Sequence, residues 1–181
     1  TRPADADHAV RGGYSEFSPA EKDKIYHVTN NRLTVSHLPT GGLDAAYGGE
    51  VAGLAGDVLN NALTIASTQD HTPTASGGPH RKTLTNAYGG AITNAGNNGT
   101  VGGLGEHEGN RVTANGETTI TNLYAGYTAG TGNVQGNLAA IGNGTVISKS
   151  YGGYSDHATG TGTVEHNGIS VDGGTLTDVY G

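Results

Sequence analysis

The sequence predicts an all-β chain, a single-domain parallel β-helix of about five to six coils. Two motifs alternate along it and recur roughly every 30 residues, a spacing typical of solenoids. The composition agrees, because 33 glycines, one Phe and no Trp or Met leave few bulky side chains for a thick globular core. A solenoid stacks small and branched residues on identical neighbours and needs only a thin core.

The first motif is Asn, any residue, an aliphatic residue, a small residue and a second small or aliphatic residue. It occupies residues 31–35, 61–65, 110–114, 137–141 and 167–171. Its alternation of apolar and small polar residues is typical of a half-buried strand. We interpret the asparagines as an internal ladder, in which each side chain bonds the equivalent group of the next coil and tolerates a left-handed turn conformation. The alternative is a row of asparagines that binds a ligand along a groove.

The second motif is an aliphatic residue followed by Tyr and, in most copies, a glycine pair. Its tyrosines are Tyr47, Tyr88, Tyr124, Tyr151 and Tyr180. We expect them to stack on one another at a corner, where glycine allows a tight turn. The alternative is a row of rings offered to sugars. A second tyrosine follows three residues later in two repeats, and these residues, Tyr127 and Tyr154, are candidates for exposure and ligand contact.

The two motifs place the core on the aliphatic positions. We predict a core of Leu33, Val35, Leu63, Ile65, Leu84, Ile120, Ile141, Ile169, Val171 and Leu176.

Residues 1–30 are the least repetitive part, and we interpret them as an N-terminal cap and a degenerate first repeat. Arg11 stands there where later repeats have Tyr. The run Ser18-Pro-Ala-Glu21 has the form of a capping box, with Pro at the first helical position. It predicts a short helical turn to about Lys24 that covers the open end of the stack.

Residues 31–181 carry the repeats proper, with loops inserted at 67–82 and 95–109 because the repeats that contain them are longer than the others. Two prolines exclude the first loop from a central strand. Loops of repeat proteins often carry recognition. The candidate contacts within them are His71, His80, Arg81, Glu106 and His107.

Charge and composition disfavour several classes of function. Sixteen acidic against nine basic residues, with a net charge of -7, argue against a nucleic-acid partner. The absence of Cys excludes disulfides and thiolate metal sites. No apolar run reaches the length of a membrane-spanning helix. The N-terminus lacks the apolar stretch of a signal peptide, so we expect a mature chain or a fragment.

Metal and catalytic sites are not predicted. The eight histidines do not occur in the pairs typical of zinc sites, and we expect no cofactor. Carboxylates are thinly spread and no nucleophile elbow occurs, so we expect a non-catalytic protein. A β-helical polysaccharide-degrading enzyme is the alternative.

The repeats over residues 120–181, and more loosely 31–181, resemble the glycine-rich passenger repeats of bacterial autotransporter adhesins. The resemblance rests on Asn167-Gly-Ile-Ser-Val171 with its following glycine pair, and on Tyr151-Gly-Gly-Tyr154. It implies a parallel β-helix displayed outside the outer membrane, on the bacterial surface or secreted, with a role in adhesion, aggregation and biofilm formation. The implied partners are a host or bacterial surface glycan or protein, or copies of the same chain.

The sequence thus predicts an extracellular adhesion or self-association module. The chain stops within a motif at Tyr180-Gly181, so it is either a cut fragment or a subunit whose ends meet. In the second case Val179 and Tyr180 are the candidate self-association contacts. Head-to-tail stacking on another copy's first coil, which we expect residues 10–15 and 31–35 to form, would build a filament.

Overall fold

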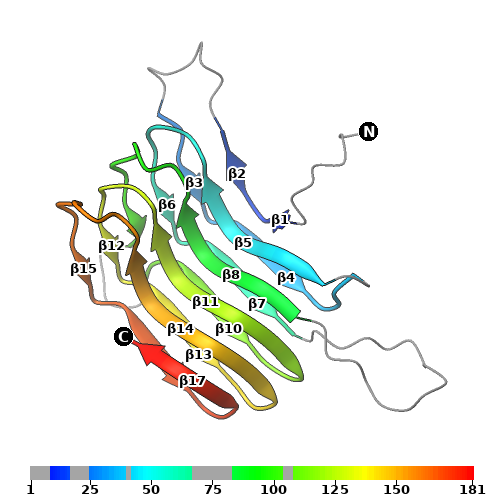
Figure 1. Ribbon diagram of the computed structural model, residues 1–181. Coiled ribbons are helices and arrows are strands. Elements are labelled where there is room, and N and C mark those ends of the chain that lie inside the picture. The colour runs from blue at the N-terminus through cyan, green and yellow to red at the C-terminus, as the bar shows by residue number, and fades with distance from the viewer. Residues whose placement is uncertain (1–8, 17–24, 40–41, 67–82, 104–107) are drawn as a thin grey trace, which may run out of the picture.

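The computed structural model describes residues 9–16, 25–39, 42–66, 83–103 and 108–181, which form strands and turns and no helix. All paired strands are parallel and belong to three sheets that run along one axis (Figure 1). Each sequence repeat adds one strand to each sheet in turn. The architecture is that of a β-solenoid, as the alternating motifs predict.

Sheet A holds the longest strand of each coil and, at its N-terminal edge, two short strands. They are β1 (Ala9–Arg11), β2 (Tyr14–Ser15), β5 (Leu43–Val51), β8 (Thr83–Ile92), β11 (Thr118–Thr128), β14 (Thr145–Ser155) and β17 (Thr175–Tyr180). Sheet B holds β3 (Val28–Thr29), β6 (Val58–Leu59), β9 (Val101–Gly102), β12 (Val134–Gln135) and β15 (Val164–Glu165). Sheet C holds β4 (Arg32–Val35), β7 (Ala62–Ile65), β10 (Arg111–Ala114), β13 (Leu138–Ile141) and β16 (Gly168–Val171).

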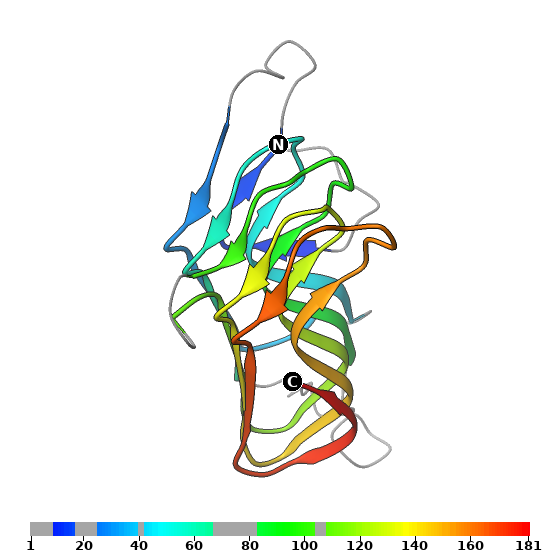
Figure 2. The same ribbon diagram turned by 90° about the vertical axis from the view of Figure 1, so that its left-hand side faces the viewer.

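One coil consists of one strand from sheet B, one from sheet C and one from sheet A. Coil 1 is β3 to β5, and coils 2 to 5 follow in order up to β15 to β17. Figure 2 shows the coils stacked one behind another, with the last coil, coloured orange to red, at one end. The first motif supplies the sheet C strand of each coil and the second motif supplies its sheet A strand.

At the N-terminal end of the described chain, sheet A is one strand level longer than sheets B and C. Strands β1 and β2 pair with β5 of coil 1, whereas sheets B and C begin with β3 and β4 of that same coil. The expectation that residues 10–15 and 31–35 form one coil is therefore wrong, because they lie at successive levels. Arg11 is in register with Tyr47, which confirms that it occupies the tyrosine position.

The core is thin and continuous along the axis. Val35, Leu63, Ile65, Leu84, Ile120 and Ile141 are buried as predicted, and Leu33, Ile169 and Leu176 are partly buried against them. A second cluster between sheets A and B consists of Val28, Val51, Val58, Ile92, Val101 and Val134. Val171 was predicted in the core but is 48% exposed, because β16 is the last strand of sheet C and no further coil covers it in the described chain.

The asparagine ladder is confirmed. The backbone N–H and the side-chain Nδ2 of Asn61 both donate to Oδ1 of Asn110, over 2.9 and 3.0 Å. The same pair of bonds joins the other neighbours in the series Asn31, Asn61, Asn110, Asn137 and Asn167. Asn61, Asn110 and Asn137 are at most 1% exposed. The ladder therefore satisfies polar groups that burial would otherwise make costly.

The left-handed conformation lies one residue before the ladder and not on it. Positive φ angles occur at Asn30 (59°), Asn60 (54°), Gly136 (69°) and His166 (54°), each just before a ladder asparagine. The chain turns there from sheet B into sheet C. The ladder asparagines themselves have no positive φ and lie directly before the sheet C strands.

The sequence suggested that the glycine pairs form tight turns, but the structure shows that they do not. They lie inside the sheet A strands, and none of their residues has a positive φ. The second glycine is required for close approach, because a Cβ on Gly49 would lie 2.6 Å from the side chain of Asn61. Gly90 and Gly153 contact the ladder in the same way. The two sequence motifs are thus coupled, because one glycine in each coil makes room for an asparagine in the next.

The second inserted loop differs from expectation. The loop at 67–82 and the capping turn from Ser18 lie outside the described residues. The loop at 95–109 is shorter than predicted, because it contains β9 and because Asn97, fully buried, bonds the neighbouring coil through Gly53. Only the segment between Gly103 and Gly109 is additional, since their N–H groups donate to the consecutive carbonyls of Gln135 and Gly136.

Candidate functional site

The tyrosines of the second motif form a stacked column on the outer face of sheet A. The tyrosine column consists of Tyr47, Tyr88, Tyr124, Tyr151 and Tyr180, with successive ring centroids 4.7, 5.1, 4.9 and 4.8 Å apart and planes within 9° of parallel. Stacking is confirmed, but the column crosses the strands of sheet A and does not lie at a corner.

Stacking determines which parts of the tyrosine rings a ligand can contact. Each ring covers the face of its neighbour, so the ring edges and hydroxyl groups are the parts left for contact. Exposure rises along the column, from 9% at Tyr47 to 49% at Tyr180. Burial, followed by the neighbouring ring of Tyr151, raises the pKa of Tyr124 to about 12, so its hydroxyl is a neutral donor and acceptor near pH 7. Sugars cannot stack on the covered faces.

Tyr127 and Tyr154 form a second, shorter row beside the column. Their ring centroids lie 5.9 Å apart with planes 13° from parallel, and their edges meet the rings of Tyr124 and Tyr151. Both side chains are half-buried, as Tyr124 and Tyr151 are, so they are not distinguished by greater exposure.

A carboxylate joins the two rings of this outer pair. The Tyr127 hydroxyl donates to Oδ2 of Asp156 over 3.3 Å, and the Tyr154 hydroxyl donates to Oδ1 over 3.4 Å. Burial and then the charge of Asp156 raise the pKa of Tyr127 to about 12. The sequence analysis missed Asp156. Its signal was its place two residues after the second tyrosine, within hydrogen-bonding reach.

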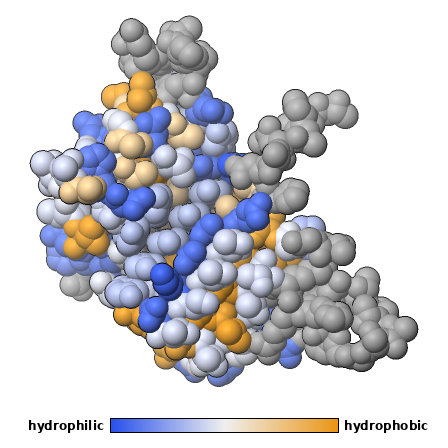
Figure 3. Space-filling model, viewed as in Figure 1, coloured by the Kyte–Doolittle hydropathy of each residue, from blue (hydrophilic) through white to orange (hydrophobic). Residues whose placement is uncertain are grey.

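A polar row flanks the column on its other side. The strand register aligns Asn86, Asn122, Lys149 and Asp178, each two residues before a column tyrosine. Nδ2 of Asn122 donates to Oδ1 of Asn86 over 3.0 Å. Figure 3 shows this face, with hydrophilic residues running diagonally across the strands. The face therefore combines aromatic edges with amide and charged groups, repeated from coil to coil.

Arg11 ends the tyrosine column at its N-terminal side. Its guanidinium lies 5.3 Å from the ring centroid of Tyr47 and 4.8 Å from that of Tyr14. It also pairs with Glu50, which is 4% exposed and accepts a 3.0 Å hydrogen bond from the Thr93 hydroxyl. These cation–π and ionic contacts fix strand β1 on coil 1.

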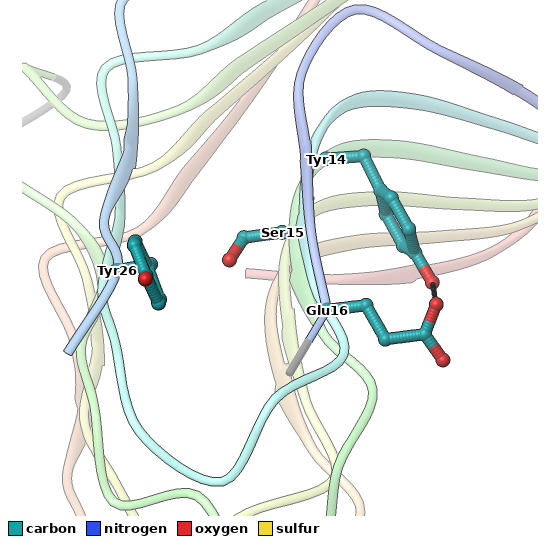
Figure 4. A pocket seen from close by; sticks show the side chains of 4 residues that line it. All are labelled: Tyr14, Ser15, Glu16 and Tyr26. Atoms are coloured by element: carbon teal, nitrogen blue, oxygen red, sulfur yellow. Dashed lines mark hydrogen bonds between the residues drawn. The ribbon is translucent and has the colours of Figure 1, made fainter. Parts of the chain in front are cut away.

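An open pocket of about 420 Å³ lies near the same end and is lined by Tyr14, Ser15, Glu16 and Tyr26. In Figure 4 Tyr26 comes from a different segment, and the Ser15 side chain points toward it, whereas the Tyr14 and Glu16 side chains point to the other side of their own segment. The Tyr14 hydroxyl donates to Glu16 over 2.8 Å, and burial together with this bond raises the pKa of Tyr14 to about 12. The sequence analysis did not predict this pocket.

The remaining predicted contacts fall into two groups. His71, His80, Arg81, Glu106 and His107 lie outside the described residues. Val179 and Tyr180 lie on β17 and are 51% and 49% exposed.

Within the described ranges, no group of three or more His, Cys, Asp or Glu side chains is placed to hold a metal ion. No helix in that part of the chain is long and apolar enough to cross a membrane. Comparison with protein-family models, curated proteins and solved structures finds no match to this chain.

Proposed function

We propose that this chain is a non-catalytic, extracellular bacterial surface module that mediates adhesion or self-association through the outer face of sheet A. The observation that carries the proposal is the repetition of that face. Tyrosine edges and hydroxyls recur at each coil, about 4.8 Å apart, beside the row of Asn86, Asn122, Lys149 and Asp178.

A repeating face suits a repeating partner. A glycan chain or the face of another solenoid can engage several rungs at once, and each further contact then forms at high effective concentration. Tyrosine is enriched at protein interfaces because it supplies area and a hydrogen-bonding hydroxyl at low entropic cost. Because the rings are held by stacking, little side-chain entropy remains to be lost on binding.

Binding by purified chain to immobilised bacterial-surface glycans and to whole bacteria would test the proposal. The double variant Asn122→Asp with Lys149→Glu changes only the polar row and should abolish retention. The matched control Arg111→Glu changes an exposed residue of β10 in sheet C and should bind as the unmodified chain does. Equal binding by all three proteins, with folding verified, would contradict the proposal.

The alternative function is a structural subunit of a filament assembled head to tail. It is favoured by the last coil, where Val171, Val179 and Tyr180 are each about half exposed and the Tyr180 ring is stacked only by Tyr151 among the described residues. In such a contact Tyr180 would meet Arg11 of the next copy, since Arg11 holds the tyrosine register at the other end.

Sedimentation over a concentration series separates the two functions. The filament alternative predicts assemblies that grow with concentration and disappear in Tyr180→Lys. A monomer at every concentration contradicts the filament alternative, whereas adhesion through sheet A does not require assembly.

A further inference from the structure

We infer that Tyr127, Tyr154 and Asp156 form an oxidative cross-linking site, at which a one-electron oxidant joins the two tyrosine rings by a carbon–carbon bond between coils 3 and 4. The inference goes beyond adhesion and does not depend on it. It rests on ring geometry, on the carboxylate that both hydroxyls contact, and on the neighbouring tyrosines.

The outer pair is in contact and has room to rearrange. Tyr127 and Tyr154 are in register on β11 and β14, with ring centroids 5.9 Å apart. The equivalent position in coil 2 is Ala91, so no third ring continues the row beyond Tyr127. Coupling requires the two rings to twist from a stacked to an edge-joined arrangement, and each ring of this pair has only one stacked neighbour among the described residues to resist the twist.

The tyrosine column lacks this freedom. Tyr124 lies between Tyr88 and Tyr151, and Tyr151 lies between Tyr124 and Tyr180, with both faces of each ring stacked. A twist of either ring would break two stacking contacts. The column therefore favours transfer of an electron between rings over coupling of rings.

Asp156 supplies the proton acceptor. A phenol that loses an electron becomes a strong acid and must lose its hydroxyl proton to form a neutral radical. Oδ2 of Asp156 lies 3.3 Å from the Tyr127 hydroxyl and Oδ1 lies 3.4 Å from that of Tyr154. One carboxylate thus serves both phenols, and its negative charge favours oxidation at these two rings over others.

The cross-link balances as follows. Each tyrosine gives one electron to the oxidant and one proton to Asp156 or, through it, to water. The two radicals join at the carbons next to their hydroxyl-bearing carbons, and the hydrogens on the joined carbons move to the oxygens. The product is dityrosine, with a net loss of two electrons and two protons.

The neighbouring tyrosine rings can pass a radical to the site. The ring centroids of Tyr88 and Tyr124 lie 5.3 and 5.4 Å from that of Tyr127. The ring centroid of Tyr151 lies 4.9 Å from that of Tyr154. A radical first formed on the column can pass to the outer pair by electron exchange between touching rings. It is trapped there because the outer pair combines a proton acceptor with room for coupling.

The test is photo-oxidation of the dilute purified chain with a ruthenium polypyridyl sensitiser and persulfate, followed by dityrosine fluorescence and peptide mapping. We expect an intramolecular cross-link between Tyr127 and Tyr154 in the monomer. Tyr127→Phe and Tyr154→Phe should each abolish it, and Asp156→Asn, a change at an exposed residue, should lower its yield several-fold. Tyr26→Phe is the control, because Tyr26 is 38% exposed and lines the pocket beside Tyr14, outside the site, so its change should leave the yield unchanged.

Three results would overturn the inference. They are the absence of dityrosine from the folded monomer, a cross-link that maps to column pairs such as Tyr124 and Tyr151, and an undiminished yield in Asp156→Asn. Circular dichroism of each variant before irradiation ensures that a lost cross-link reports on the site and not on unfolding.

Discussion

The asparagine ladder inside the solenoid and the tyrosine column outside it run along the same axis and repeat once per coil. They differ in that the ladder places polar groups in the interior and the column places aromatic rings at the surface. The ladder buries polar side chains by giving their amide groups partners, and its central members are at most 1% exposed. The column keeps aromatic rings at the surface by covering their faces with one another. We infer that the ladder contributes more to stability than the column does, whereas the column is available for contact with other molecules.

Removal of a ladder rung should have the largest effect on stability. Asn110→Ala leaves the buried N–H group of Asn61 without its side-chain acceptor. It also removes one of the three bonds of Asn61 Nδ2 and the side-chain donor of the Val58 carbonyl. An unsatisfied buried group costs about 1–3 kcal/mol and each further lost bond about 1 kcal/mol, so we expect a loss of about 3 kcal/mol in urea unfolding. Asn122→Ala is the matched control on the outer face, and it should cost under about 1 kcal/mol because water can replace its one bond to Asn86.

Removal of a column ring should have a smaller effect. Tyr124→Ala deletes a half-buried ring and its stacking with Tyr88 and Tyr151, and we expect a loss of about 2 kcal/mol. Tyr124→Phe keeps the stack and should change the free energy of unfolding by less than about 0.5 kcal/mol. If both variants lose the same amount, the hydroxyl and not the stacking stabilises the column.

Alkaline pH should weaken the tyrosine column and the outer pair beside it. Burial raises the pKa of Tyr124 and of Tyr127 to about 12 in the folded protein, against about 10 in the unfolded chain. The folded state therefore holds more protons between these values, and stability is full below pH 10 and falls as the pH rises towards 12. Urea unfolding at pH 9, 10 and 11 measures this decline. Stability that does not fall above pH 10 would contradict the raised pKa values.

The smallest effect is expected at Ser150, a core residue whose polar group is not hydrogen-bonded as those of the ladder are. The Ser150 hydroxyl is fully buried and has no hydrogen-bond partner, whereas the in-register residue of coil 2 is Ala87. Ser150→Ala should stabilise the protein by about 1 kcal/mol, because it removes an unsatisfied polar group. A loss of stability in thermal unfolding would show that the hydroxyl has a partner in solution.

The sequence predicted what repeats and missed what occurs once. The strands, the ladder and the stacking of tyrosines all follow from periodic positions, where the same residue type meets itself in each coil. The role of the second glycine was missed because it depends on contact between Gly49 and Asn61, twelve residues apart in sequence but in adjoining coils.

Single features of the candidate site were missed for a similar reason. Asp156 and the Arg11–Glu50 pair occur in one coil each, so no periodicity marks them. The extent of the second loop was also misjudged, because the buried Asn97 lies in a run of Gly and Asn that reads as an exposed turn. The place of Arg11 in the tyrosine series was predicted from the glycine pair and Tyr14 that follow it, but its pairing with Glu50 was not.

Native-state hydrogen exchange tests the contrast between ladder and column most directly, because it needs no substitution. The backbone N–H groups of Asn61 and Asn110 donate to the buried Oδ1 of the next rung, so we predict that they exchange only through global unfolding. Those of Val179 and Tyr180, on the half-exposed last strand, should exchange orders of magnitude faster. Ladder amides that exchange as fast as those of Val179 and Tyr180 would contradict the claim that the asparagine ladder contributes more to stability than the tyrosine column does.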